Sequence, residues 1–169
     1  MLFGKINNRN VYVIVNHNIV SLKRTVIEQL WRSKGRKIVI YTYGNRSIAN
    51  RIAVEFPDSD LFEFGGYSST LADTRERARA LGYQLAVEIF SEALQINNLN
   101  IIITGYENLH ISSLEYEDKE LTSVFLSELL ESMDPEHNRN SLYFISSTGD
   151  EVVEVAIKSI FPQAVLINE

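Results

Sequence analysis

Short apolar runs alternate along the chain with longer segments whose apolar residues recur at helical spacing. The short runs predict strands over Val11–Val15, Lys37–Tyr43, Leu61–Phe64, Asn100–Thr104, Leu142–Ser146 and Ala164–Ile167. The longer segments predict helices over Ser21–Ser33, Ser47–Phe56, Leu71–Leu94, Asp118–Met133 and Glu151–Ile160. Nearly continuous apolar runs, such as Val11–Val15 and Asn100–Thr104, are typical of central strands in a parallel sheet that is covered on both faces.

Strands that alternate with helices of this length predict an α/β fold: three layers, with a mostly parallel sheet flanked by helices. The sequence contains no internal repeat, low-complexity tract or linker. We therefore expect residues 1–169 to form a single α/β domain, which belongs to a larger protein.

Composition narrows the classes of function. The 169 residues carry a net charge of −6, which argues against a broad nucleic-acid-binding face. The chain has no cysteine, so disulfides and thiolate metal sites are excluded. Its three histidines are scattered along the chain, and we expect no metal site. No apolar run reaches the length of a membrane span and no signal peptide is recognisable, which favours the cytoplasm.

The segment after the first predicted strand has the layout of a phosphate-binding loop. Lys23 follows the strand by eight residues and a helix comes next, as in the G-x-x-x-x-G-K-[ST] motif. His17 stands at the first glycine, Asn18 comes next in the loop, and Leu22 stands at the second glycine. Arg24 replaces the Ser/Thr, so that only the lysine keeps its type.

These replacements predict a dismantled nucleotide site. The glycines of the motif let backbone N–H groups wrap around phosphates, and Cβ atoms at His17 and Leu22 would enter that space. The Ser/Thr hydroxyl normally binds Mg²⁺, which Arg24 cannot ligate. The alternative is an ordinary strand-to-helix loop from Asn16 to Ser21, with Ser21 as the N-cap.

The predicted strand Asn100–Thr104 leads into Thr104, Gly105, Tyr106 and Glu107. In a P-loop core, acids at this strand end hold Mg²⁺ and polarise the attacking water. Thr104 and Gly105 supply no charge, and Glu107 is a weak candidate for a catalytic base because it comes two residues late. After Leu142–Ser146, the Ser/Thr residues could sense a phosphate or cap the next helix.

The order of parts resembles a known family. The altered phosphate loop, the Gly65-Gly66-Tyr67 turn and the stretch Ile103–Glu107 recur in the order found in additional-strand P-loop NTPases. Within them the chain is most similar to the FtsK/SpoIIIE class. It particularly resembles the C-terminal ATPase-like domain of the EssC/EccC coupling proteins of type VII secretion.

The resemblance implies a RecA/FtsK-like P-loop core and a catalytically degenerate domain. That domain would act in substrate recognition and assembly of a type VII secretion motor. It would be the soluble part of a membrane-anchored protein. Its partners would be small helical secretion substrates of the WXG type and neighbouring ATPase domains in a hexamer, with no nucleic acid. No cofactor is expected, and binding of ATP and Mg²⁺ is doubtful because the motifs that hold them are missing.

Two alternatives stay open. An active but atypical P-loop NTPase would combine Lys23, Glu107 and an arginine from a neighbour. A flavodoxin-like domain would instead bind a ligand at the carboxyl ends of its strands. That crevice would be lined by Asn16-His17-Asn18, Thr42-Tyr43-Gly44 and Thr104-Gly105.

Overall fold

The computed structural model describes residues 11–42, 45–64, 74–90, 100–108, 119–133 and 141–168. The strands are β1 (Val11–Val15), β2 (Lys37–Thr42), β3 (Asp60–Phe64), β4 (Asn100–Thr104), β5 (Ser141–Ser146) and β6 (Val165–Asn168). The helices are α2 (Ile19–Trp31), α3 (Arg46–Glu55), α4 (Arg75–Phe90), α5 (Lys119–Met133) and α6 (Glu151–Ile160), with a 3₁₀ turn η3 (Tyr106–Asn108).

The predicted strands are confirmed to within one residue at each described end, and the last helix is confirmed at both ends. The longest predicted helix, Leu71–Leu94, extends beyond the described segment, within which α4 runs from Arg75 to Phe90. The predicted turn at Gly65-Gly66-Tyr67 lies outside the described residues, as do Tyr43 and Gly44.

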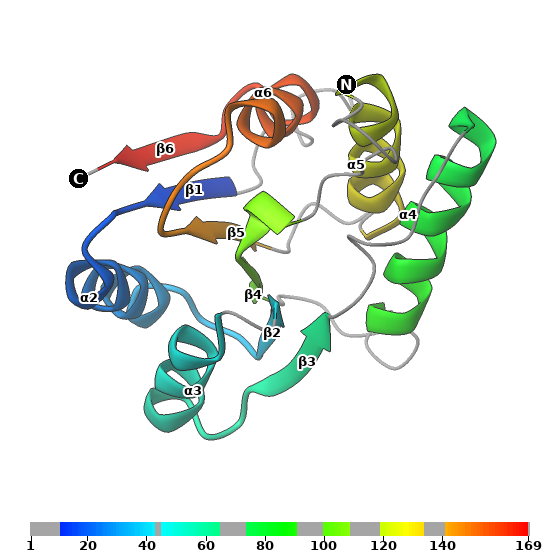
Figure 1. Cartoon of the computed structure of the whole chain (residues 1–169). Coiled ribbons are helices and arrows are strands. Elements are labelled where there is room, and N and C mark those ends of the chain that lie inside the picture. The colour runs from blue at the N-terminus through cyan, green and yellow to red at the C-terminus, as the bar shows by residue number, and fades with distance from the viewer. Residues whose placement is uncertain are drawn as a thin grey trace, which may run out of the picture.

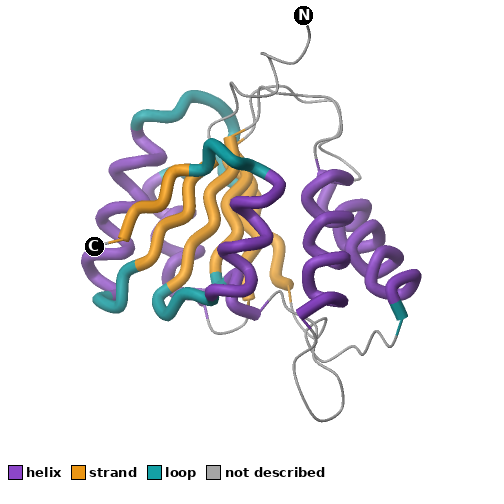
Figure 2. Tube along the Cα trace, turned by 90° about the horizontal axis from the view of Figure 1, so that it is seen from above, coloured by secondary structure: helices purple, strands orange, loops and turns teal. Residues whose placement is uncertain are grey.

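The strands form one parallel sheet in the order β3-β2-β4-β5-β1-β6 (Figure 1). From β1 the chain moves through β2 to β3, and it then returns through β4 and β5 to β6. Because crossovers between parallel strands are right-handed, this reversal places the later helices on the opposite face. Helices α2 and α3 cover one face, and α4, α5 and α6 lie on the other (Figure 2). The predicted three-layer α/β fold is confirmed.

Each face of the sheet has its own core. Ile14 packs with α2 and α3, whereas its neighbours Val13 and Val15 pack on the other side. This alternation explains why β1 is apolar at every position, since a strand that is covered on both faces must bury both sets of side chains.

Helix α4 reaches the core through close contact with α5. Ala78, Gly82 and Ala86 recur at four-residue spacing, so they lie on one face of α4. A Cβ atom at Gly82 would lie 2.5 Å from the carbonyl oxygen of Phe125 and 2.9 Å from the amide nitrogen of Leu129. The two helix backbones therefore approach too closely for any side chain at position 82.

The strand order separates this chain from the flavodoxin-like alternative. A flavodoxin-like sheet has the order 2-1-3-4-5, with β1 between β2 and β3. Here β1 lies between β5 and β6, so the flavodoxin-like prediction is wrong. Among the helices that the structure describes, none combines the length and the apolar character that a membrane crossing requires.

Candidate functional site

The carboxyl ends of β1, β4 and β5 lie side by side at one edge of the sheet. After β1 the chain enters α2 on one face, and after β5 it enters α6 on the other. Adjacent strands that send the chain to opposite faces form the crevice where α/β proteins usually bind ligands. We therefore built the candidate site from the β1–α2 junction, the β4 end and the β5–α6 junction.

The β1–α2 junction is only three residues long and satisfies its own backbone groups. The amide of Asn16 donates to the carbonyl of Ser146 at 3.3 Å, and Asn16 Oδ1 accepts from the amide of Asn18 at 2.9 Å. Asn18 Oδ1 accepts in turn from the amides of Val20 and Ser21, at 3.0 and 3.1 Å. The first turn of α2 is thus capped by a side chain of the chain itself.

This geometry corrects the predicted loop. Helix α2 begins at Ile19, so the residues from Val20 to Arg24 are helical, and the N-cap is Asn18 instead of Ser21. Asparagine and serine are comparable caps, and Asn18 wins because its position lets one oxygen accept two amides. Leu22 is fully buried between α2 and the sheet.

The remaining residues of the predicted loop are dispersed. His17 is exposed within the short junction, whereas Lys23 is half-buried in the second turn of α2 and Arg24 is exposed beside it. These residues do not fit a magnesium-bound phosphate. The amides of Val20 and Ser21 are already bonded, and the position of the magnesium-binding hydroxyl holds a cation.

The end of β4 is tied to its neighbouring strands. Thr104 is buried, and its Oγ1 donates to the carbonyl of Ile40 at 3.4 Å. Gly105 has φ +73°, and its amide donates to the carbonyl of Ile145 at 2.7 Å. Neither residue brings charge to the edge of the sheet, as the sequence predicts.

Tyr106 connects the end of β4 to α6. It is fully buried, and its hydroxyl donates to Glu154 Oε2 at 2.8 Å. The same oxygen accepts from the amide of Asp150 at 2.6 Å. Burial is the main reason why the pKa of Tyr106 is raised, and the Glu154 hydrogen bond and the charges of Glu154, Glu107 and Asp150 raise it further. Tyr106 therefore stays neutral and acts as a hydrogen-bond donor.

At the β5–α6 junction, the N-cap of α6 is Asp150, whose Oδ1 accepts from the amide of Val153 at 3.1 Å. The Ser/Thr run does not cap the helix, so that prediction is wrong. Ser146 Oγ instead accepts from the amides of Thr148 and Gly149, at 3.1 and 2.7 Å. The turn before the cap is therefore fixed by Ser146.

Glu107, the candidate catalytic base, lies in η3 with a half-buried side chain. Its Oε2 is shielded from solvent and makes no hydrogen bond. A catalytic base must reach the proton that it removes, and no contact of the described residues orients Glu107 toward a nucleophile. Within the described segments, no group of three or more histidine, cysteine or acidic side chains is arranged to hold a metal ion.

The Tyr106–Glu154–Asp150 network was missed by reasoning from sequence. A partial signal exists, because an acid four residues after an N-cap aspartate is close to the spacing of a capping box. The tyrosine has no such local signal, since 48 residues separate it from Glu154. Comparisons with protein-family models and with curated proteins find no match to the chain. The fold and these junctions define it as an α/β domain with a parallel sheet.

Proposed function

We propose that this domain is a catalytically degenerate P-loop core that works by binding other proteins within an FtsK/SpoIIIE-like motor. One observation carries the proposal: the N-terminus of α2 is capped by Asn18. In a nucleotide-binding core, the amides at that helix end would be available to a phosphate. Here the same amides are satisfied internally, and Leu22 belongs to the core.

The strand order supports the P-loop part of the proposal. The additional-strand NTPases are named after a strand between the phosphate-loop strand and the strand that carries the acids. In this chain β5 lies between β1 and β4. The same two strands, β1 and β4, end in residues that lack the motif glycines and the acids. Loss at both places fits a site that is no longer used for hydrolysis.

The finer proposal concerns the partners. The resemblance to EssC/EccC coupling proteins supports small helical-hairpin secretion substrates and the neighbouring ATPase domains of the same motor. The domain would then recognise substrates and stabilise the assembly, while other domains hydrolyse ATP.

Calorimetric titration with ATP and Mg²⁺ tests the degenerate core, with Lys23→Ala as the matched variant. We expect no heat of binding from either protein at millimolar ATP. Binding tighter than about 100 μM, or roughly 5.5 kcal/mol, that is lost in Lys23→Ala would contradict the proposal. It would favour the active NTPase that combines Lys23, Glu107 and an arginine from a neighbour.

A separate titration with a purified WXG-type helical hairpin tests the partner. We expect saturable binding that a helical hairpin of similar length and charge, without the WXG turn, does not show. Equal binding of both hairpins, or of neither, would contradict the secretion-substrate proposal. The degenerate core would stand or fall with the ATP titration alone.

A further inference from the structure

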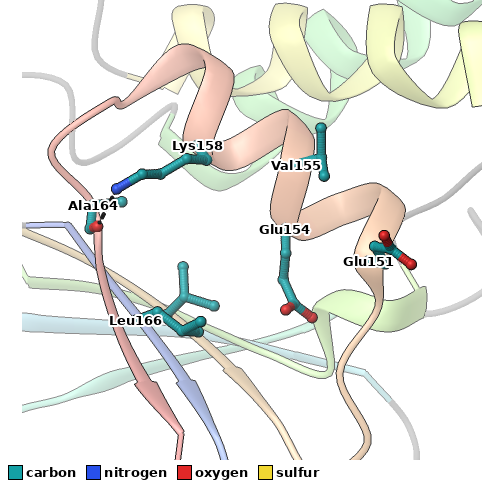
Figure 3. A pocket seen from close by; sticks show the side chains of 7 residues that line it. Glu151, Glu154, Val155, Lys158, Ala164 and Leu166 are labelled. Atoms are coloured by element: carbon teal, nitrogen blue, oxygen red, sulfur yellow. Dashed lines mark hydrogen bonds between the residues drawn. The ribbon is translucent and has the colours of Figure 1, made fainter.

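A surface pocket of about 450 Å³ lies between α6 and the edge strand β6 (Figure 3). Its apolar lining comes from Val13, Val155, Ala164 and Leu166, and its charged lining comes from Glu151, Glu154 and Lys158. The size is within the usual range of ligand-binding clefts, about 300–1,000 Å³. The pocket is remote from the β1–α2 junction in composition, since it contains no residue of α2.

Strand β6 is apolar on both faces although it is an edge strand. Val165 and Leu166 are consecutive, so their side chains point to opposite faces of the sheet, and they are 50% and 56% exposed. On its outer edge, β6 pairs with no other strand in the described part of the chain. Proteins usually protect such an edge with lysine, proline or a bulge, and Val165–Asn168 contains neither lysine nor proline.

The face of α6 that borders the pocket carries an acid, an aliphatic residue and a base in that order. Glu151, Val155 and Lys158 are spaced by four and three residues, so they lie on one side of the helix. Val155 is 62% exposed. Lys158 Nζ donates to the carbonyl of Ala164 at 2.9 Å, as Figure 3 shows.

The two charges of this face cannot neutralise each other. Seven residues of α-helix separate Glu151 from Lys158, which is about 10.5 Å along the helix axis. Among the described residues, neither forms an ion pair. Both charges are therefore available to a partner, on either side of an exposed aliphatic centre.

We propose that α6 and β6 form a two-fold interface between two copies of this chain. In a two-fold contact each surface meets itself in the reversed direction. Reversal places Glu151 opposite Lys158 of the second copy and Lys158 opposite its Glu151. Val155 and Leu166 then lie near the centre of the contact, and the outer edge of β6 is covered by the second β6.

The order of charges is what selects a second copy as the occupant. An acid–apolar–base pattern is complementary to its own reverse, whereas an unrelated partner would need a matching pattern of its own. This interface goes beyond the proposed function and does not depend on it. It also differs from the head-to-tail contacts that build a ring, because those contacts join two different surfaces.

Sedimentation equilibrium of the full chain, up to about 1 mM, tests the interface. We expect a dimer whose dissociation constant rises at least about tenfold in Lys158→Glu and in Glu151→Lys, because each change faces like charges at both ends of the contact. The double variant Glu151→Lys/Lys158→Glu restores opposite charges, so we expect its dissociation constant to return to that of the unaltered chain.

The double variant separates an interface from a simple helix-dipole effect. An acid in the first turn and a base in the last turn also stabilise an isolated helix. If that were their only role, the double variant would have the least stable helix, and no variant would change the oligomeric state. A monomer at every concentration, a hexamer insensitive to these charges, or a double variant that fails to recover would each overturn the proposal.

The edge strand provides a second test. Leu166→Lys places a charge at the centre of the contact and is expected to abolish the dimer. Val54→Lys is the matched control, since Val54 is an exposed aliphatic residue of α3, 73% exposed, and we expect it to leave the dimer unchanged. Circular dichroism establishes that each variant is folded. A folded Leu166→Lys variant that dimerises as tightly as Val54→Lys would overturn the proposal.

Discussion

The β1–α2 and β5–α6 junctions are neighbours at the same edge of the sheet, and they satisfy their backbone groups in different ways. At the first junction, the side chains of Asn16 and Asn18 bond amides within three residues of themselves. At the second, Glu154 accepts from Asp150 and from Tyr106, which comes from the end of β4. One junction is local, and the other joins two strand ends to a helix.

This difference shows two ways in which an edge that usually binds ligands can be closed. A local cap uses the amides of α2 that would otherwise be free for a phosphate. The non-local network uses a carboxylate and a buried hydroxyl, so its hydrogen bonds also connect β4 to α6. Substitutions at the first junction should therefore act independently of the β4 end, and substitutions at the second should not.

The largest effect is expected at Leu22, which tests whether the β1–α2 region is core or a former loop. Leu22→Ala should lower the free energy of unfolding by about 2–5 kcal/mol, because it removes a fully buried side chain. Urea denaturation measures the loss. Val20→Ala, at an exposed position of the same helix, should cost less than about 0.5 kcal/mol. Equal and small losses at both positions would show that Leu22 is not core.

Tyr106→Phe tests the non-local junction. The change removes a buried hydroxyl that donates to a carboxylate, and such bonds contribute about 1.5–3 kcal/mol. Urea denaturation near pH 7 should show a loss in this range. A loss below about 0.5 kcal/mol would mean that the hydrogen bond does not stabilise the fold.

The pH dependence of stability isolates the same hydroxyl. The pKa of Tyr106 is raised in the folded state, chiefly by burial. Its contribution is therefore complete below the ordinary tyrosine pKa of about 10 and is lost as the pH rises above that value. Between about pH 10 and pH 11, the unaltered chain should lose more stability than Tyr106→Phe. Tyr143, whose pKa is also raised, is present in both proteins and cancels in the difference. Parallel curves would contradict the assignment.

Double-mutant cycles sharpen the contrast between the junctions. Asn18→Ala and Asp150→Ala each remove an N-cap and should each cost about 1 kcal/mol. Combined with Tyr106→Phe, the Asn18→Ala effect should add to within about 0.5 kcal/mol. The Asp150→Ala effect should not add, because Tyr106 and the Asp150 amide share one oxygen of Glu154. Equal additivity at both junctions would remove the distinction.

The smallest effect is expected at Lys23. The side chain is half-buried in the second turn of α2, and Lys23→Ala should change the free energy of unfolding by less than about 0.5 kcal/mol. Thermal unfolding with and without ATP and Mg²⁺ should give the same Tm for both proteins. A nucleotide-dependent rise in Tm that disappears in Lys23→Ala would contradict a closed junction.

Much of the fold follows from local patterns. The apolar runs predict the strands because a buried parallel strand has no polar face to interrupt them, as in Val11–Val15. The start of α2 was predicted wrongly because Asn18 and Ser21 are both good caps, and spacing to Lys23 favoured the later one. The Tyr106–Glu154 bond could not be predicted from spacing, since it exists only because β4 and β5 are adjacent.

The most direct test is a ¹H–¹⁵N correlation spectrum of the chain during titration with ATP and Mg²⁺. Its informative signals are the amides of Val20 and Ser21, which bond to Asn18 Oδ1. If the junction is closed, these two signals stay in place up to millimolar nucleotide. Saturable shifts centred on the same amides would show that α2 still binds a phosphate, and the proposal of a degenerate core would be wrong.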